Sequence, residues 1–79
     1  MNRAAAIGKR IWAWRKQFGI SQRAFAKEIM TSQVVVSHWG NGVNTPNAYT
    51  IARICRFTGL TADYLLGVEE TYDDDYKHR

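Results

Sequence analysis

The fold is decided by the stretch from Gly19 to Gly42, which reads GISQRAFAKEIMTSQVVVSHWGNG. Ser21 and Ser32 each precede a run of helix-forming and apolar residues. A serine at such a position caps a helix, because its hydroxyl oxygen accepts a hydrogen bond from a free N–H of the first turn. The glycines that follow Trp39 end the second of these helices. The stretch therefore predicts two short helices joined by a tight turn.

A longer helix precedes this pair. Its apolar residues recur at intervals of three or four, the spacing that places side chains on one face of an α-helix. The residues on that face are Ala4, Ile7, Ile11, Trp14 and Phe18. Gly19 ends the helix, since glycine adopts the left-handed conformation of a helix C-terminus without strain. Trp12 falls off the buried face, so we expect it to pack under the C-terminal tail or to contact a partner.

Two more helices are expected after the loop that contains Pro46. Asn47 and Thr61 are good N-caps, and Gly59 ends the first of these two helices. The β-branched residues 34–36 would suit a strand, but no second strand is available to pair with them. We therefore predict an all-α fold, a compact bundle of four to five helices.

Charge divides the chain into two parts. Its 79 residues are enough for one domain only. Residues 1–68 carry nine basic and two acidic side chains, a net charge of +7, whereas residues 69–79 carry two basic and five acidic side chains, a net charge of −3. We predict a folded domain over 1–68 and an acidic tail over 69–79. A basic domain attracts polyanions, so nucleic acid and anionic membrane are candidate partners. The alternative is that the charge serves only solubility and indicates no partner.

Several classes of protein are disfavoured by what the sequence lacks. The longest run without a charged side chain, from Ile29 to Ala52, is interrupted by glycine, asparagine and proline, so no membrane span is expected. The N-terminal residues lack the apolar segment of a secretory signal, so we expect a cytoplasmic protein. Cys55 has no cysteine partner and His38 has no second ligand at i+4, so no disulfide, metal site or cofactor is expected. No acid, base and nucleophile stand at a meaningful spacing, which argues against an enzyme.

The helix from Ser32 to about Trp39 carries the functional signal. One arc of that helix, about 140° wide, holds Gln33, Val34, Ser37, His38 and Asn41. Amide, hydroxyl and imidazole groups hydrogen-bond base edges in a DNA major groove, and an exposed valine contacts a thymine methyl group. A solvated helix face more often carries lysine and glutamate. The arc therefore favours base recognition, with an ordinary solvated surface as the alternative.

Five motifs follow one another between Ile7 and Val68. They are I-G-x-R-I-x-x-x-R-K (7–16), G-I-S-Q-x-x-x-A (19–26), S-Q-x-x-V-S-x-W-x-x-G (32–42), P-x-x-x-T-I-x-x-I (46–54) and G-L-T-x-D-Y-L-L-G (59–67). In this order and spacing the sequence resembles the lambda-repressor-like helix-turn-helix domains of the Cro/Xre type. The resemblance implies a five-helix bundle that binds operator DNA, commonly as a symmetric dimer.

The resemblance also implies roles for particular residues. Gln22 matches a position that holds a DNA phosphate and braces Gln33, which matches the first base-reading position. An amide side chain there bonds adenine in a bidentate manner. The base-reading residues are then Gln33, Val34, Ser37 and His38. The backbone contacts are Gln22, Arg23, Arg10, Lys9, Asn41 and Asn44, and the dimer contacts are Pro46, Ala62, Tyr64 and Leu65.

The sequence departs from the family's pattern around the third helix. Met30 stands where the family often has glycine, and a left-handed conformation there costs methionine roughly 1 kcal/mol more, so we expect a slightly reshaped turn. Gly40 stands where the family often has glutamate, so Arg15 lacks its usual buried acid. A buried guanidinium without an acceptor is unfavourable. We predict that Arg15 turns to a phosphate, a backbone carbonyl or another carboxylate.

Three functions remain open at this point. The first is a sequence-specific regulator, a phage or bacterial repressor that binds a near-palindromic operator on double-stranded DNA as a homodimer. The second is an antitoxin-like or other partner-binding regulator that uses the helical domain and the acidic tail to bind a protein. The third is sequence-blind binding, in which the basic surface alone supplies the affinity. The uncharged arc of the third helix favours the first.

Overall fold

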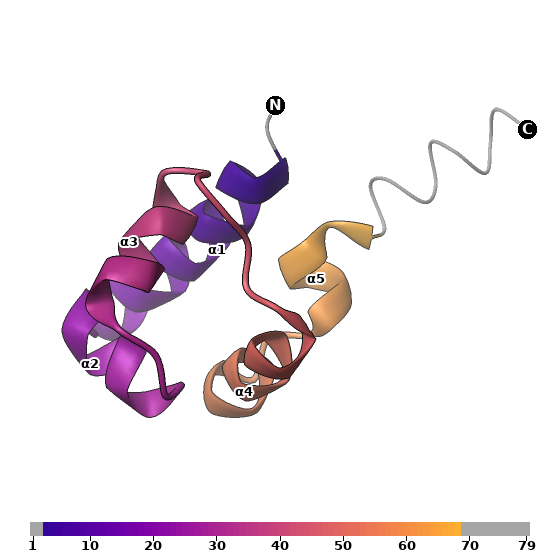
Figure 1. Ribbon diagram of the computed structural model, residues 1–79. Coiled ribbons are helices and arrows are strands. Elements are labelled where there is room, and N and C mark those ends of the chain that lie inside the picture. Colours follow the sequence, from indigo (N-terminus) through magenta and orange to yellow (C-terminus); the bar gives the residue numbers. More distant parts are fainter. Residues whose placement is uncertain (1–2, 69–79) are drawn as a thin grey trace, which may run out of the picture.

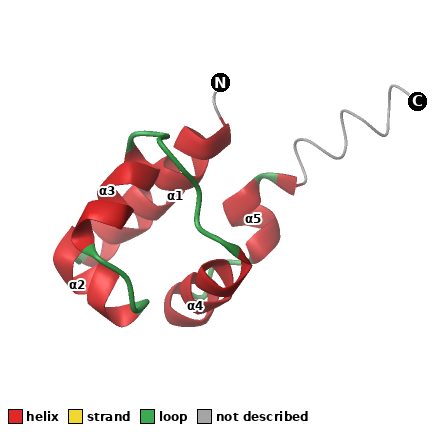
Figure 2. Ribbon diagram, in the orientation of Figure 1, coloured by secondary structure: helices red, strands yellow, loops and turns green. Residues whose placement is uncertain are grey.

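The computed structural model describes residues 3–68 as a bundle of five helices (Figure 1). They are α1 (Arg3–Phe18), α2 (Gln22–Glu28), α3 (Gln33–Gly40), α4 (Ala48–Thr58) and α5 (Ala62–Leu66). Loops join them, and these residues contain no strand (Figure 2). The all-α expectation is confirmed. Residues 69–79 lie outside the described part of the chain, so the domain boundary, the tail and its protein partner stay predictions.

The helices form two groups connected through α1. Figure 1 shows α2 and α3 on one side of the molecule and α4 and α5 on the other, with the loop after α3 crossing between them. α1 packs against both α3 and α5, α2 packs against α3, and α4 packs against α5. Within residues 3–68, none of the helices has the length and the apolar character that crossing a bilayer requires.

The four shorter helices begin at the polar residues predicted to cap them. Side-chain oxygens of Ser21, Ser32, Asn47 and Thr61 accept hydrogen bonds from the backbone N–H three residues further on, at 2.9–3.2 Å. At the other ends, Gly19 follows α1 with a φ of 65° and Gly59 follows α4 with a φ of 80°. These are the left-handed C-terminal glycines that the sequence predicts. The helix limits are therefore set by local hydrogen bonding.

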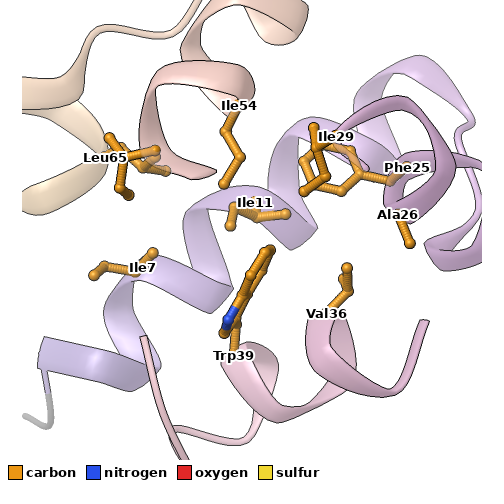
Figure 3. Packing of buried hydrophobic residues seen from close by; sticks show 10 residues of the cluster. Ile7, Ile11, Phe25, Ala26, Ile29, Val36, Trp39, Ile54 and Leu65 are labelled. Carbon is orange, nitrogen blue, oxygen red and sulfur yellow. The ribbon is translucent and has the colours of Figure 1, made fainter. Parts of the chain in front are cut away.

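One buried apolar cluster draws side chains from all five helices (Figure 3). It consists of Ile7, Ile11, Phe25, Ala26, Ile29, Val36, Trp39, Ile51, Ile54 and Leu65. Trp14 and Phe57 pack against the cluster, with their ring centroids 5.4 Å apart. The prediction that Phe18 is buried with them is wrong: its side chain is 57% exposed at the end of α1, where it contacts the ring of Trp14.

Leu65 belongs to this core, and its side chain is fully buried. In Figure 3 it points inward from α5 together with Ile54 of α4. A side chain with no exposed surface cannot contact a second chain, so the expectation that Leu65 forms a dimer contact is wrong. Its neighbours Tyr64 and Leu66 are exposed instead.

α1 and α3 meet backbone to backbone at Gly8. A Cβ atom placed on Gly8 would overlap the carbonyl group of Trp39 and lie 2.6 Å from the Cα of Gly40. No real Cβ atom tolerates such distances, so only glycine permits this approach. The contact holds the inner side of α3 against α1 and leaves its other side directed away from the bundle.

The turn between α2 and α3 contains Met30 in the left-handed conformation, with a φ of 62°. The N–H of Thr31 donates to the carbonyl oxygen of Ala26 at 2.9 Å, which closes the end of α2. Met30 thus adopts the left-handed conformation that glycine favours, and the expected reshaping of the turn stays a prediction. The side chain of Met30 is 75% exposed, so its packing offsets little of the strain.

Candidate nucleic-acid interface

α3 turns one side to the core and the other to solvent. Val36 and Trp39 are buried on the inner side, where Trp39 is only 2% exposed. The outer side holds Gln33, Val34, Ser37 and His38, of which the first two are exposed and the last two half-buried. The structure thus brings the four predicted base-reading residues onto one surface of one helix. Their contact with bases stays a prediction.

A shallow depression, open to solvent, lies between α2 and α3. It is lined by Ser21, Arg23, Ala24, Ala26, Lys27, Thr31 and Gln33. The side chains of Arg23 and Lys27 are exposed, so two positive charges stand beside Gln33, the first residue of α3. Cationic groups next to an uncharged helix face can bind phosphates while the helix itself contacts bases.

Gln22 lies where α1, α2 and α3 meet. Its half-buried side chain lines a cavity of about 30 Å³, whose other lining residues include Trp12, Arg15 and Gly40. The residue is therefore placed beside the end of α3 as well as at the start of α2. Its predicted contacts, to a phosphate and to Gln33, stay predictions.

The guanidinium group of Arg15 finds its acceptor in the turn after α1. Its Nη1 atom donates a hydrogen bond to the carbonyl oxygen of Ile20 at 3.0 Å. A backbone carbonyl was one of the three predicted acceptors, so this prediction is confirmed. The Nε atom is buried and has no hydrogen-bond partner among the described residues. Burial lowers the pKa of Arg15 from its usual value, because desolvation disfavours the charged form.

Arg10 lies on a different surface from the one predicted. Its Cζ atom is 5.4 Å from the centroid of the Tyr64 ring, and its guanidinium group also lies against Gly67. Arg10 is about 200° around α1 from Gly8, which faces α3. A cation over an aromatic face is stabilised there, so Arg10 packs on α5. The structure does not bring Arg10 to the surface formed by α2 and α3.

The remaining predicted contacts lie on α1, in the loop after α3 and on or near α5. Lys9, Asn41 and Asn44 are exposed, the first on α1 and the other two in the loop after α3. The N–H of Val43 donates to the carbonyl oxygen of His38 at 2.9 Å, which holds the start of this loop against the end of α3. Of the predicted dimer contacts other than Leu65, Ala62 and Tyr64 are exposed and Pro46 is half-buried.

Trp12 and Lys16 form a pair to which sequence reasoning assigned no joint role. The Trp12 side chain is 54% exposed, and the Nζ atom of Lys16 lies 5.6 Å from the centroid of its ring. Their i, i+4 spacing on a helix was the available signal, because residues so spaced are neighbours on the helix surface. Within residues 3–68, no three histidine, cysteine, aspartate or glutamate side chains form a group that could hold a metal ion.

These features define a class of protein. Two short helices, α2 and α3, are joined by a tight turn, and the second presents an uncharged, exposed side next to basic residues. Residues 13–65 match the family model described as helix-turn-helix. The chain belongs to this helix-turn-helix family, and the resemblance drawn from its motifs is confirmed.

A particular relative is the Repressor protein C2 of Salmonella phage P22. The two sequences are 33% identical over 60 residues, which cover 76% of this chain and 28% of that protein. A solved structure, the crystal structure of the P22 c2 repressor protein in complex with synthetic operator 9T in the presence of Tl+, has the same fold, with a TM-score of 0.72 and 33% identity. The match covers 76% of this chain and 91% of that one. The chain thus spans little more than a quarter of the relative's full length.

Proposed function

We propose that this protein binds double-stranded DNA sequence-specifically and acts as a transcriptional repressor of the phage or bacterial type, not as an enzyme. The observation that carries the proposal is the outer side of α3, where the predicted base-reading residues share one accessible surface without a charged residue on the helix. Similarity to a phage P22 protein named as a repressor, with a structure in complex with a synthetic operator, supports the same role.

In this proposal α3 enters the major groove. The amide N–H of Gln33 donates to N7 of adenine and its oxygen accepts from the N6 amino group in a bidentate contact, and Val34 packs against a thymine methyl group. Val34 suits this role because its side chain is 63% exposed, which leaves it accessible to a base. Ser37 and His38, about one turn further along α3, contact the next bases.

Phosphate contacts then orient α3 without selecting a sequence. Arg23 and Lys9 supply positive charge, and Gln22, Asn41 and Asn44 supply polar groups on either side of α3. Charged contacts of this kind release counterions, so the affinity falls steeply as salt rises. In this proposal, the contacts of α3 with the bases determine which DNA sequence is bound.

A homodimer on a near-palindromic operator completes the proposal. Two copies would place their α3 helices in successive major grooves, about 34 Å apart. The surface proposed for the contact is that of α5 and the residues next to it, where Ala62 and Tyr64 are exposed. Leu66 and Val68 also expose apolar surface there, at 41% and 37%.

Selection of bound sequences from random duplex DNA tests the proposal directly. We expect an inverted-repeat consensus, which the protein binds at near-physiological salt at least about 10³-fold more tightly than unrelated duplex. Sedimentation of the complex should give two chains per duplex. A reporter gene with the consensus in its promoter should lose expression when the protein is present.

Each part of the proposal has an outcome that rejects it. Equal affinity for the selected and the unrelated duplex would leave only sequence-blind binding. A consensus with a single half-site, bound by one chain, would reject the dimer and keep the base recognition by α3. Increased reporter expression would reject the repressor and identify an activator.

A further inference from the structure

A strip along α1 combines two positive charges with a large exposed aromatic side chain. Lys9, Trp12 and Lys16 lie within about 60° of one another around α1. All three are exposed, and Trp12 exposes 54% of its surface. An aromatic side chain of this size is usually buried, because its burial stabilises a small domain more than that of any smaller residue. The exposed ring of Trp12 is therefore accessible to a partner.

The strip adjoins the predicted interface. Trp12 lines the small cavity that Gln22 and Gly40 also line, so it stands next to the start of α2 and the end of α3. Lys16 extends from the next turn of α1, and its Nζ atom lies 5.6 Å from the centroid of the Trp12 ring. This cation–π contact fixes the ammonium group beside the indole ring.

The charges around the strip favour a polyanion. Within residues 3–68 the only carboxylate side chains are those of Glu28, at the end of α2, and Asp63, on α5. Both are on other helices, so α1 itself supplies no carboxylate to the strip. Lys9 and Lys16 are seven residues apart in the sequence, a rise of about 10 Å along the helix, which is comparable with the axial rise over about three nucleotide steps of one DNA strand.

We propose that the Trp12–Lys16 pair binds the sugar–phosphate backbone of DNA next to the bases that α3 contacts. The indole Nε1–H of Trp12 donates a hydrogen bond to a phosphate oxygen, and the ring holds the Lys16 ammonium group toward the same strand. Trp12 and Lys16 are positioning residues that extend the interface from α2 and α3 onto α1. This inference rests on the proposed function, since it assumes that α3 lies in the groove.

Two substitutions in the full chain separate the hydrogen bond from the charge. Lys16→Gln should weaken binding about 3- to 10-fold on the selected duplex and on unrelated duplex alike, and reduce the salt slope by about 1. Trp12→Phe keeps a ring but removes the N–H donor, so binding should weaken about 2- to 10-fold with an unchanged salt slope. Arg56→Gln removes the same charge from an exposed position on α4 and should change neither quantity.

Tryptophan fluorescence reports the contact independently of affinity. Trp12 is far more exposed than the buried Trp39 or the half-buried Trp14, so DNA that covers α1 should change the emission of Trp12. The change on adding a saturating amount of the selected duplex should disappear in Trp12→Phe. Circular dichroism of each variant confirms that the fold is retained.

The outcomes distinguish this inference from the proposed function. If the wild-type chain shows no preference among DNA sequences, the proposed function fails and the inference fails with it. If the wild-type chain binds its consensus while Lys16→Gln and Trp12→Phe match its affinity and salt slope, only the inference is overturned. A fluorescence change that persists in Trp12→Phe would also overturn it.

Discussion

The two sides of α3 are built from one run of eight residues but meet different surroundings. On the inner side, Val36 and Trp39 fill the core between α1 and α2, and Gly8 lets the backbone of α3 approach α1. On the outer side, Gln33 and Val34 are open to solvent. On the inner side, the space in the core limits the size of the side chains. On the outer side, hydrogen-bonding and methyl groups are accessible from solvent.

This difference separates stability from recognition within a single helix. A substitution on the inner side changes the packing of three helices and should alter the free energy of unfolding. A substitution at the exposed Gln33 or Val34 of the outer side removes little internal packing and should alter mainly the choice of DNA sequence. Four experiments test whether stability and recognition are separated in this way.

The largest effect is expected at Trp39. Trp39→Ala should lower the free energy of unfolding by about 3–5 kcal/mol, because it leaves a cavity at the centre of the core. Val34→Ala, on the other side of the same helix, should change it by less than about 0.5 kcal/mol. Urea unfolding followed by circular dichroism measures the free energy of unfolding of both variants. If the alanine variant does not fold, Trp39→Phe can be measured instead, because it should lose less free energy of unfolding. Similar losses at the two positions would refute the separation.

A second test compares two glycines at the contact of α1 with α3. Gly8→Ala should cost about 1–3 kcal/mol, because its methyl group overlaps the backbone of Trp39. Gly40→Ala should instead stabilise by roughly 0.5–1 kcal/mol, because a Cβ there meets nothing within 4 Å and alanine favours the helix. Thermal unfolding gives the sign of each change. A stable Gly8→Ala variant would mean that α1 and α3 do not approach so closely.

The third test addresses the outer side through binding. Gln33→Ala should cost about 1–3 kcal/mol on the consensus duplex and relax the preference at one base pair, without changing stability. Lys9→Ala should weaken all sequences alike and reduce the salt slope. Gel shift on consensus, single-mismatch and unrelated duplexes separates the two. Equal losses for Gln33→Ala on every duplex would exclude Gln33 as a base-reading residue.

The smallest effect is expected in the turn that joins α2 to α3. Met30→Gly should stabilise the domain by about 0.5–1 kcal/mol, because glycine adopts the left-handed conformation without the strain that methionine incurs. Met30→Ala keeps the Cβ atom and should leave the stability of the domain unchanged. Thermal unfolding of both variants measures this. A gain for both would show that the exposed methionine side chain, not its backbone, is unfavourable.

The part of the candidate site that lies on a single helix, α3, could be predicted from the sequence. Gln33, Val34, Ser37 and His38 follow from helical periodicity alone, because the inner residues of α3 are apolar. For the hydrogen-bond acceptor of Arg15, the sequence predicted only that it is a phosphate, a backbone carbonyl or another carboxylate. Which of these groups accepts depends on the path of the turn after α1. The structure selected the carbonyl oxygen of Ile20.

Sequence reasoning failed where the outcome depended on two helices. Arg10 carries the charge expected of a phosphate contact, but the docking of α5 against α1 places it over Tyr64. Leu65 and Tyr64 are adjacent in a five-residue helix, and only the angle at which α5 packs decides which of them is buried. The way in which α5 packs is not encoded in a local motif.

Local features of the sequence set where the helices begin and end and which side of each is apolar. The reason is that capping hydrogen bonds, glycine conformations and helical periodicity act within about four residues. The packing of the five helices set which residues share a surface and which are buried: it placed Trp12 beside Gln22 and Arg10 over Tyr64, and it enclosed Leu65. These placements depend on distances between segments far apart in the chain, which only the packing of the common core sets.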